Sequence, residues 1–482
     1  MIKAIGVGRS FFLARMLGPA DYGTWMTLML IVAYVPILSL GSAETLLKSY
    51  PFYIGGNDYV QAKRIENGVV SVLLFSSCAI IGISFFSQIV LDFLEIPISY
   101  LMMVRLMLYA SAISCFSSFF LHRFAAHQEF KEASVLATTK SFISFLLLVG
   151  LGYRWGLRGT VSGFLISESV LGLLFVVVSL NKCGSVSFKW DFSLYRQIVR
   201  IGFPITLLWW IFVLQTSVDR GISMSMLGKT HTGYYSLGVS LVSLIILLPS
   251  AINRVLYPRV NEKMGESNNH ESLAQLVCSH VRAQSLILPF FIGILILLAP
   301  LVYSFLPKYQ AGLYSGMILI AGSFFVCLVK PSSNFLIATD RQNRLLLYLV
   351  FSLLLNVILS ITCVRLGLGI SGIALSTSLS AFVLSSLILV NILLFVAESN
   401  PLAVVKQFLS VLLPLLHSVA FALLLCYINY YCFEYSYLLL GISLCAFVML
   451  YIGFGLLPSN RRVLRNLLLQ AKEKPPHDCR MV

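Results

Sequence analysis

Long apolar runs, each about 20 residues in length, follow one another along nearly the whole chain. Segments such as 101–121, 159–180 and 369–395 contain at most one charged side chain each. A run of this length can cross the hydrocarbon core of a bilayer as an α-helix. A transmembrane β-barrel would instead show alternating segments of about 10 residues, and these runs do not alternate. The sequence therefore predicts an all-α polytopic membrane protein.

Polar breaks between the runs define about fourteen predicted spans. Only 11% of the 482 residues are charged, against about 25% in soluble proteins, which excludes a large soluble enzyme. The approximate bounds of the spans are 2–17, 23–47, 67–91, 101–121, 134–152, 159–180, 202–227, 234–256, 284–306, 312–337, 345–364, 369–395, 407–429 and 436–457.

Basic residues are concentrated in alternate loops. Most of the 34 Lys and Arg residues fall on one side, among them Lys63 and Arg123. The other side receives Arg154, Arg158, Lys229, Lys308 and Arg365. Cytoplasmic loops carry the excess of positive charge, so both termini are expected in the cytoplasm. The same rule accounts for the net charge of +15, and no nucleic-acid partner is predicted.

A turn motif recurs in the second half of the chain. Leu17-Gly18 is followed by Gly23, and Leu227-Gly228 is followed by Gly233 at the same spacing, 210 positions later. Each turn precedes an apolar segment that begins with an aromatic residue, Trp25 in the first case and Tyr235 in the second.

Two further features repeat with nearly the same offset. Arg154-Trp155-Gly156-Leu157 and Arg365-Leu366-Gly367-Leu368 lie 211 positions apart. An interruption of the second span at 36–39 is expected to have a counterpart at 247–249. Separate segments that agree on one offset indicate an internal duplication of about 200 residues. Because each copy holds six spans, the two repeats are predicted to be parallel, with a substrate site between them near mid-membrane.

The duplication also defines the predicted domains. The segment between the repeats mixes basic residues with Phe188, Trp190, Phe192 and Tyr195, a composition typical of an interfacial helix. The predicted parts are an N-lobe (1–181), a cytoplasmic amphipathic linker (182–200), a C-lobe (201–396), helices 13 and 14 (397–457) and a basic cytoplasmic tail (458–482).

Ionisable side chains within or at the ends of the spans are the candidate functional residues. At the bilayer centre each costs roughly 2.5–3.5 kcal/mol on insertion scales, so such residues usually face protein or water. Basic residues predominate, which favours an anionic substrate, because Arg can bind phosphate oxygens through two parallel hydrogen bonds. The basic candidates are Arg9, Arg15, Lys48, Arg220, Arg254 and Lys330. The acidic candidates, which could carry a coupling ion, are Glu44, Glu168 and Asp219.

Structural interpretations stay open for several of these residues. Arg15, Lys48 and Arg254 lie near span ends, from which they could extend to lipid headgroups. Asp219 could neutralise a base on the first or second span, and a hydrogen bond to a neighbouring serine would be sufficient for Glu168.

Cofactor chemistry has no sequence support. The sequence contains no phosphate-binding glycine loop, paired-histidine zinc motif or nucleophile elbow. The 10 cysteines lack metal-ligand spacing and mostly fall in apolar spans, as expected of reduced packing residues. Residues 1–17 contain two arginines and no small-residue cleavage site, so no cleavable signal peptide is expected. No cofactor and no enzymatic activity are predicted.

Several segments together resemble a known family. The segments 15–23, 227–235 and 253–260 occur in order, and a basic aromatic linker precedes Ile201-Gly202-Phe203-Pro204. With the fourteen spans, they resemble polysaccharide-repeat flippases (Wzx-type O-antigen translocases) of the multidrug/oligosaccharidyl-lipid/polysaccharide exporter superfamily. The resemblance implies transfer of an undecaprenyl-pyrophosphate-linked oligosaccharide from the inner to the outer leaflet of the bacterial cytoplasmic (inner) membrane.

The same resemblance implies roles for the candidate residues. The six basic candidates would bind the pyrophosphate while the sugars occupy the cavity between the lobes. Membrane lipids and other membrane proteins of polysaccharide assembly are the implied partners. Candidate sugar-stacking surfaces are Tyr22, Trp25, Tyr34, Trp209 and Trp210.

Two alternative functions stay open. A drug/cation antiporter of the same superfamily normally has twelve spans and an acid-lined pocket, whereas this chain has about fourteen spans and mostly basic candidates. A membrane O-antigen polymerase or ligase would carry a large external loop with catalytic residues, whereas the predicted external loops are short.

Overall fold

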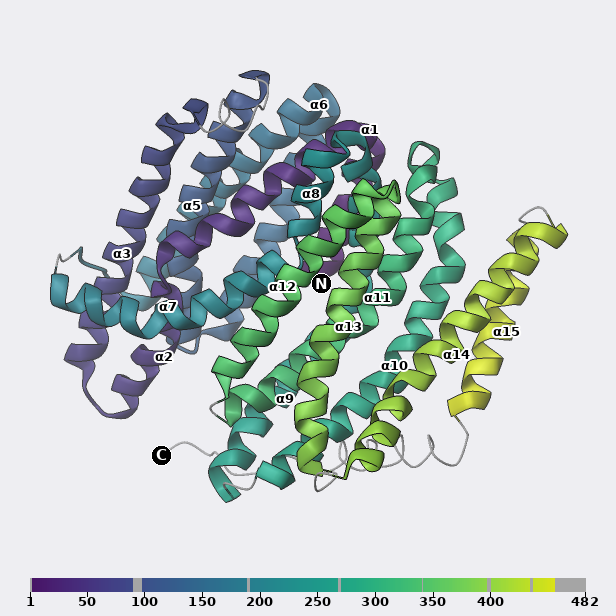
Figure 1. The fold of residues 1–482 in the computed structure, drawn as a ribbon. Coiled ribbons are helices and arrows are strands. Elements are labelled where there is room, and N and C mark those ends of the chain that lie inside the picture. The colour runs from purple at the N-terminus through teal and green to yellow at the C-terminus, as the bar shows by residue number, and fades with distance from the viewer. Residues whose placement is uncertain are drawn as a thin grey trace. The chain divides into compact units, whose positions relative to one another are not determined.

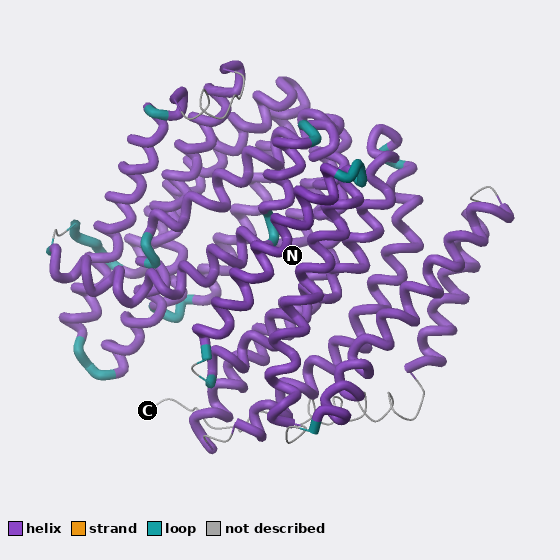
Figure 2. The backbone as a smooth tube through the Cα atoms, in the orientation of Figure 1, coloured by secondary structure: helices purple, strands orange, loops and turns teal. Residues whose placement is uncertain are grey.

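The computed structural model describes residues 2–89, 98–188, 191–267, 270–339, 341–396, 400–433 and 437–455. Within these ranges every regular element is a helix (Figures 1 and 2). The elements are α1 (Ile2–Tyr34), η1 (Val35–Ser39), α2 (Ser42–Gly55), α3 (Tyr59–Phe85), η2 (Ile98–Tyr100), α5 (Leu101–Ala126), α6 (Phe130–Cys183), α7 (Phe192–Gln215), α8 (Val218–Met226), α9 (Lys229–Ser267), α10 (His270–Ser304), η3 (Pro307–Gly312), α11 (Leu313–Ala338), α12 (Gln342–Arg365), α13 (Gly369–Val396), α14 (Pro401–Phe433) and α15 (Tyr437–Gly455).

The predicted all-α polytopic fold is confirmed. Among the described residues, 11 helical segments are long and apolar enough to cross a membrane. Two of them hold two predicted spans each, because α1 is broken at Gly18 and α6 at Trp155–Gly156. The shorter apolar helix α15 supplies the last predicted span. Each predicted span therefore corresponds to a helix or to one side of a broken helix, except that the second (23–47) also includes η1 and the start of α2, and the seventh (202–227) also includes α8.

The duplicated turns adopt matching conformations. Gly18 (φ 71°) and Gly228 (φ 86°) occupy the same place in the two repeats, as do Gly156 (φ 59°) and Gly367 (φ 82°). Residues with a Cβ atom rarely adopt positive φ, whereas glycine does so readily. A positive φ at all four positions agrees with the internal repeat predicted from the spacing, which stays a prediction.

One predicted element of the repeat was wrong. In the first half the helix gives way to η1, and Leu40 (φ 51°) and Gly41 (φ 80°) are left-handed before α2 begins. The counterpart expected at 247–249 is absent, since α9 is continuous from Lys229 to Ser267. Position 251, which corresponds to Gly41, is an alanine and favours helix.

The two copies of the turn motif contact each other. A Cβ atom added to Gly23 would lie 1.9 Å from the carbonyl oxygen of Lys229. One added to Gly233 would lie 1.9 Å from the carbonyl oxygen of Pro19. Pro19 and Lys229 are themselves 210 positions apart. Each copy thus presents its glycine to the other's carbonyl group, which is the reciprocal pattern of a two-fold contact.

Contacts divide the chain into two compact units, Met1–Leu237 and Gly238–Val482. In the first unit, α1, α2, α3, α5 and α6 pack together and α7 packs on α2 and α3. In the second, α10, α11, α12 and α13 pack together, and α14 and α15 pack on α10. The repeat pattern assigns α7 to the second lobe, yet here it lies in the first unit. The lobes predicted at 1–181 and 201–396 stay predictions.

Candidate functional site

Arg220 lies in the first turn of α8, just after the break that ends α7. Its side chain is half-buried, and its Nε atom is buried without a hydrogen-bond partner. The neighbouring Asp219 does not pair with it. The Asp219 carboxylate, which is 2% exposed, accepts hydrogen bonds from the Tyr235 hydroxyl and, at 2.8 Å, from the backbone N–H of Arg220. Among the described residues, the Arg220 guanidinium therefore has no carboxylate in ion-pair contact.

Aromatic side chains lie beside this arginine. The Tyr34 hydroxyl of α1 forms a 2.9 Å hydrogen bond with Ser217 Oγ, and Arg220 interacts electrostatically with Tyr34. The Tyr34 ring meets the Trp210 ring edge to face, with centroids 6.4 Å apart. The Trp210 Nε1 atom is buried and also lacks a partner. Buried polar groups are normally hydrogen-bonded, so two unpaired donors near one tyrosine suit a ligand that supplies acceptor oxygens.

A second charged cluster joins α1 to both halves of α6. Arg9 Nη1 donates to Ser144 Oγ at 2.9 Å. Lys140 Nζ pairs at 2.8 Å with Glu168, which is 3% exposed and interacts electrostatically with Arg9. The partner of Glu168 is therefore a lysine and not the serine that the structural alternative named. Two cations share one carboxylate, so the cluster carries a net positive charge.

The other predicted site residues are more dispersed. Glu44 is half-buried and accepts a 3.3 Å hydrogen bond from Thr206. Arg15 and Lys48 are exposed on the first unit. Lys330 is half-buried in α11 of the second unit, directly before Pro331. The side chain of Arg254 lies outside the described residues.

The aromatic candidates separate by burial. Tyr22 and Trp25 are almost fully buried, and Trp25 packs edge to face on Phe164. Neither offers a surface on which a sugar could stack. Trp209 is exposed. Tyr34 and Trp210 are half-buried beside Arg220, and each offers an aromatic ring and a polar group to a substrate.

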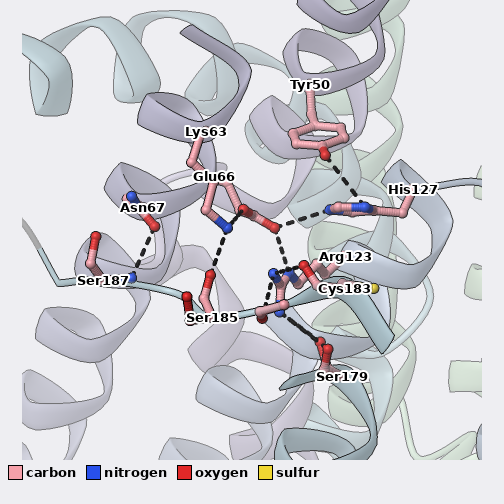
Figure 3. Close-up of polar contacts among 11 residues, drawn as sticks. Tyr50, Lys63, Glu66, Asn67, Arg123, His127, Ser179, Cys183, Ser185 and Ser187 are labelled. Atoms are coloured by element: carbon pink, nitrogen blue, oxygen red, sulfur yellow. Dashed lines mark hydrogen bonds and ion pairs between the residues drawn. The ribbon is translucent and has the colours of Figure 1, made fainter. Parts of the chain in front are cut away.

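A buried charge network was not predicted. Glu66 of α3 accepts hydrogen bonds from Arg123 Nε, from Lys63 Nζ at 2.5 Å and from His127 Nε2 at 3.1 Å (Figure 3). Both Glu66 and Arg123 are 0% exposed. Burial raises the pKa of Tyr50 to about 12. The Tyr50 hydroxyl lies 3.3 Å from His127 Nδ1, and the two rings stack with their centroids 4.4 Å apart.

The network was missed because of where the predicted spans end. The third span was predicted to begin at residue 67 and the fourth to end at 121, so Glu66 and Arg123 fell just outside. In the structure α3 begins at Tyr59 and α5 ends at Ala126. A carboxylate one residue from a long apolar run was the available signal. No group of three His, Cys, Asp or Glu residues suited to a metal ion occurs in the described part of the chain.

Comparisons with known proteins agree with this architecture. Residues 1–264, more than half of the chain, match the polysaccharide biosynthesis protein family, Polysacc_synt. A curated relative from Shigella flexneri, named "Putative O-antigen transporter", is 22% identical over 333 residues, which cover 66% of this chain and 77% of the relative.

Two solved structures have a similar fold. The lipid II flippase MurJ, in an inward closed conformation, has a TM-score of 0.72 at 15% identity, covering 94% of this chain and 96% of that one. An inward-facing multidrug resistance transporter of the MATE family, in the MOP superfamily, has a TM-score of 0.72 at 13% identity, covering 83% and 95%. At such low identity the likeness shows the fold alone.

Proposed function

Because the chain belongs to the polysaccharide biosynthesis protein family, we propose that it flips a lipid-linked glycan. The chain is a multi-pass membrane protein whose relatives are transporters and not enzymes. The proposed substrate is an undecaprenyl-pyrophosphate-linked oligosaccharide repeat unit, transferred from the cytoplasmic to the outer leaflet of the bacterial inner membrane by alternating access. Both termini are proposed to lie in the cytoplasm.

The observation that carries the proposal is the unpaired guanidinium of Arg220. A charge among apolar helices is costly, and such charges usually serve a substrate or ion path. The buried Nε–H of Arg220 lacks an acceptor, and no carboxylate among the described residues neutralises the group. A pyrophosphate would supply both the acceptor oxygens and the counter-charge.

The cluster around Arg9 supports the same proposal, because in the described part of the chain Arg9 and Lys140 share one carboxylate, that of Glu168. Arg15 and Lys48 are exposed on the same unit, and both stay proposed ligands of the pyrophosphate. Arg254 and Lys330, which belong to the second unit, stay proposed pyrophosphate ligands on the basis of the sequence.

The membrane potential can supply the driving force. A pyrophosphate carries roughly two negative charges, and moving each outward through an inside-negative potential contributes about 2.3 kcal/mol per 100 mV. Coupling to H⁺ or Na⁺ would use an acidic residue. Glu44 is the best placed of the three candidates, because Asp219 is held by Tyr235 and Glu168 by Lys140.

Replacement of Arg220 tests this function. Arg220→Ala is expected to reach the membrane in normal amounts, to stop delivery of the glycan to the cell surface and to accumulate the lipid-linked repeat unit. Arg158→Ala, an exposed arginine of the same unit, is the matched control and should deliver normally. Normal delivery by Arg220→Ala would remove the anion site. Drug resistance conferred on a sensitive host, without glycan delivery, would instead favour the drug/cation antiporter.

A further inference from the structure

The segment that joins the two repeats is held against the first unit through its main chain. Arg123 Nη2 donates to the carbonyl oxygens of Cys183, at 2.7 Å, and Gly184, at 3.0 Å (Figure 3). Lys63 Nζ donates to the carbonyl oxygen of Ser185 at 2.6 Å. The backbone N–H of Ser187 donates to Asn67 Oδ1 at 3.0 Å. Four main-chain atoms of the connecting segment are thereby hydrogen-bonded to side chains of α3 and α5.

Two buried charges form the centre of this attachment. Glu66 orients Arg123 and Lys63 by accepting a hydrogen bond from each, and Ser179 Oγ accepts a further bond from Arg123 at 3.1 Å. A buried ion pair is often no more stabilising than apolar side chains of similar volume, whereas loss of one partner is strongly destabilising. Stability alone therefore gives little reason for the network, but it does specify one path for the connecting segment.

The second repeat has no equivalent of the network. The positions 210 residues after Lys63 and Glu66 are Leu273 and Leu276, and the position 211 residues after Arg123 is Asn334. The charges are thus not part of the architecture that both repeats share. The chain has one segment between its repeats, and the network accompanies that segment.

The attachment continues along α7. Asp191 caps α7 by accepting from the backbone N–H groups of Ser193 and Leu194, and it pairs with Arg64 at 2.6 Å. Leu194 and Ile198 lie so close to Gly68 that a Cβ there would meet their side chains at 2.6 and 2.8 Å.

Close packing extends from there to α2. Thr45 Oγ1 donates to the Ile198 carbonyl oxygen at 2.8 Å, and a Cβ on Gly202 would lie 1.9 Å from the Gly41 carbonyl oxygen. The first half of α7 is therefore fastened to α2 and α3 along its length.

We propose that Glu66, Arg123, Lys63 and Asn67 form a latch that fastens the connecting segment, and with it α7, to the first unit throughout transport. α7, which the repeat pattern assigns to the second lobe, then moves with the first. This inference goes beyond the proposed function, because it concerns which helices move together and holds whatever molecule is carried.

A covalent lock tests the latch directly. Asn67→Cys combined with Ser187→Cys places two thiols where the hydrogen bond now lies, and a short bifunctional thiol reagent can join them. The joined protein is expected to retain the delivery rate of the same double variant before crosslinking. The single-cysteine variants control for reaction at native cysteines. Arrest of delivery by the crosslink would show that the segment must detach, and failure of the pair to crosslink would contradict the contact; either result overturns the proposal.

A second variant weakens the latch without removing its charge. Arg123→Lys keeps a cation beside Glu66, but a single ammonium group is too compact to reach Ser179, Cys183 and Gly184 together. Crosslinking of the cysteine pair is expected to slow about fivefold, as loss of one ordinary hydrogen bond would produce, and delivery is expected to fall while the amount of protein in the membrane is retained. Lys131→Ala, which removes an exposed basic side chain of the same unit that takes no part in the attachment, is the matched control. Unchanged crosslinking and delivery in Arg123→Lys would overturn the proposal.

Discussion

Gly23 and Gly233 lie 210 positions apart in the sequence and each packs on the backbone of the other's turn. The contact is reciprocal, since Gly23 faces the carbonyl oxygen of Lys229 and Gly233 faces that of Pro19. The two copies of the duplicated turn motif thus pack directly against each other within one chain. The two backbones lie too close together to admit a Cβ atom at either position, so both positions require glycine.

Alanine at either glycine should therefore be harmful. A Cβ atom at Gly23 or Gly233 would lie 1.9 Å from a carbonyl oxygen, and overpacking typically costs about 1–3 kcal/mol. Gly23→Ala and Gly233→Ala are each expected to lower the melting temperature of the detergent-solubilised protein and to reduce glycan delivery. Gly82→Ala, with nothing within 4 Å of the added atom, is the control and should leave both unchanged. Wild-type stability in both test variants would show that the turns can separate freely.

The Lys140–Glu168 pair should respond differently to single and double replacement. Removing one partner of a buried pair costs about 3–5 kcal/mol, whereas replacing both with apolar side chains is often neutral. Glu168→Met leaves both Arg9 and Lys140 without their shared carboxylate and is expected to reduce the amount of folded protein more than Lys140→Met, which leaves Arg9 near Glu168. The double variant is expected to recover part of the loss. If Lys140 also attracts the substrate, the recovered protein will still deliver little glycan. Full delivery by the double variant would limit the pair to a structural role.

At Trp210 the contribution of the aromatic ring to transport can be tested separately from that of its N–H group. Trp210→Phe keeps an aromatic ring beside Tyr34 but removes the N–H that lacks an acceptor. Because that N–H bonds to no described protein group, the melting temperature should be unchanged, while delivery should fall by about fivefold if a substrate oxygen accepts from it. Trp209→Phe, at an exposed neighbour, provides the comparison. Equal delivery by both variants would remove Trp210 from the site.

Acidic pH should weaken the start of α7. The Arg64 guanidinium, with hydrogen bonds from Ser193 and Leu194, holds the pKa of Asp191 well below its ordinary value of 3.8. A carboxyl group with a lowered pKa in the folded state contributes stability above its ordinary pKa and loses that contribution as the pH falls below it. The melting temperature should therefore decrease between pH 5 and pH 3, and Asp191→Asn should show a smaller decrease. Parallel pH profiles for the two proteins would contradict this assignment.

The fold could be predicted from the sequence because its strongest determinants are local. A run of apolar residues long enough to cross a bilayer has few alternatives to a helix, and Gly18 and Gly228 mark the same turn in both repeats. The prediction failed at 247–249, where it relied on symmetry with 36–39. The break in the first half depends on Gly41, and the matching position is Ala251.

The polar contacts were harder to predict because they join distant parts of the chain. Arg9 was identified as a candidate, but its contact with Ser144 spans 135 positions. Arg123 was assigned to a basic loop, and its partner Glu66 is 57 positions away. A count of charges per loop cannot distinguish a solvated arginine from a buried one. That distinction depends on how α3, α5 and α6 pack.

The latch holds the connecting segment by main-chain atoms of Cys183, Gly184, Ser185 and Ser187. Every residue type except proline offers the same carbonyl and amide groups, so the side chains at 183, 185 and 187 are free to change over evolution without loosening the attachment. Position 184 is the exception, because its φ of 79° favours glycine. The length of the segment is not free in the same way. Inserting or deleting a single residue would move every later carbonyl out of register with Arg123 and Lys63, so related chains that keep this pair of bases should keep the spacing from Cys183 to Ser187 even where its letters differ.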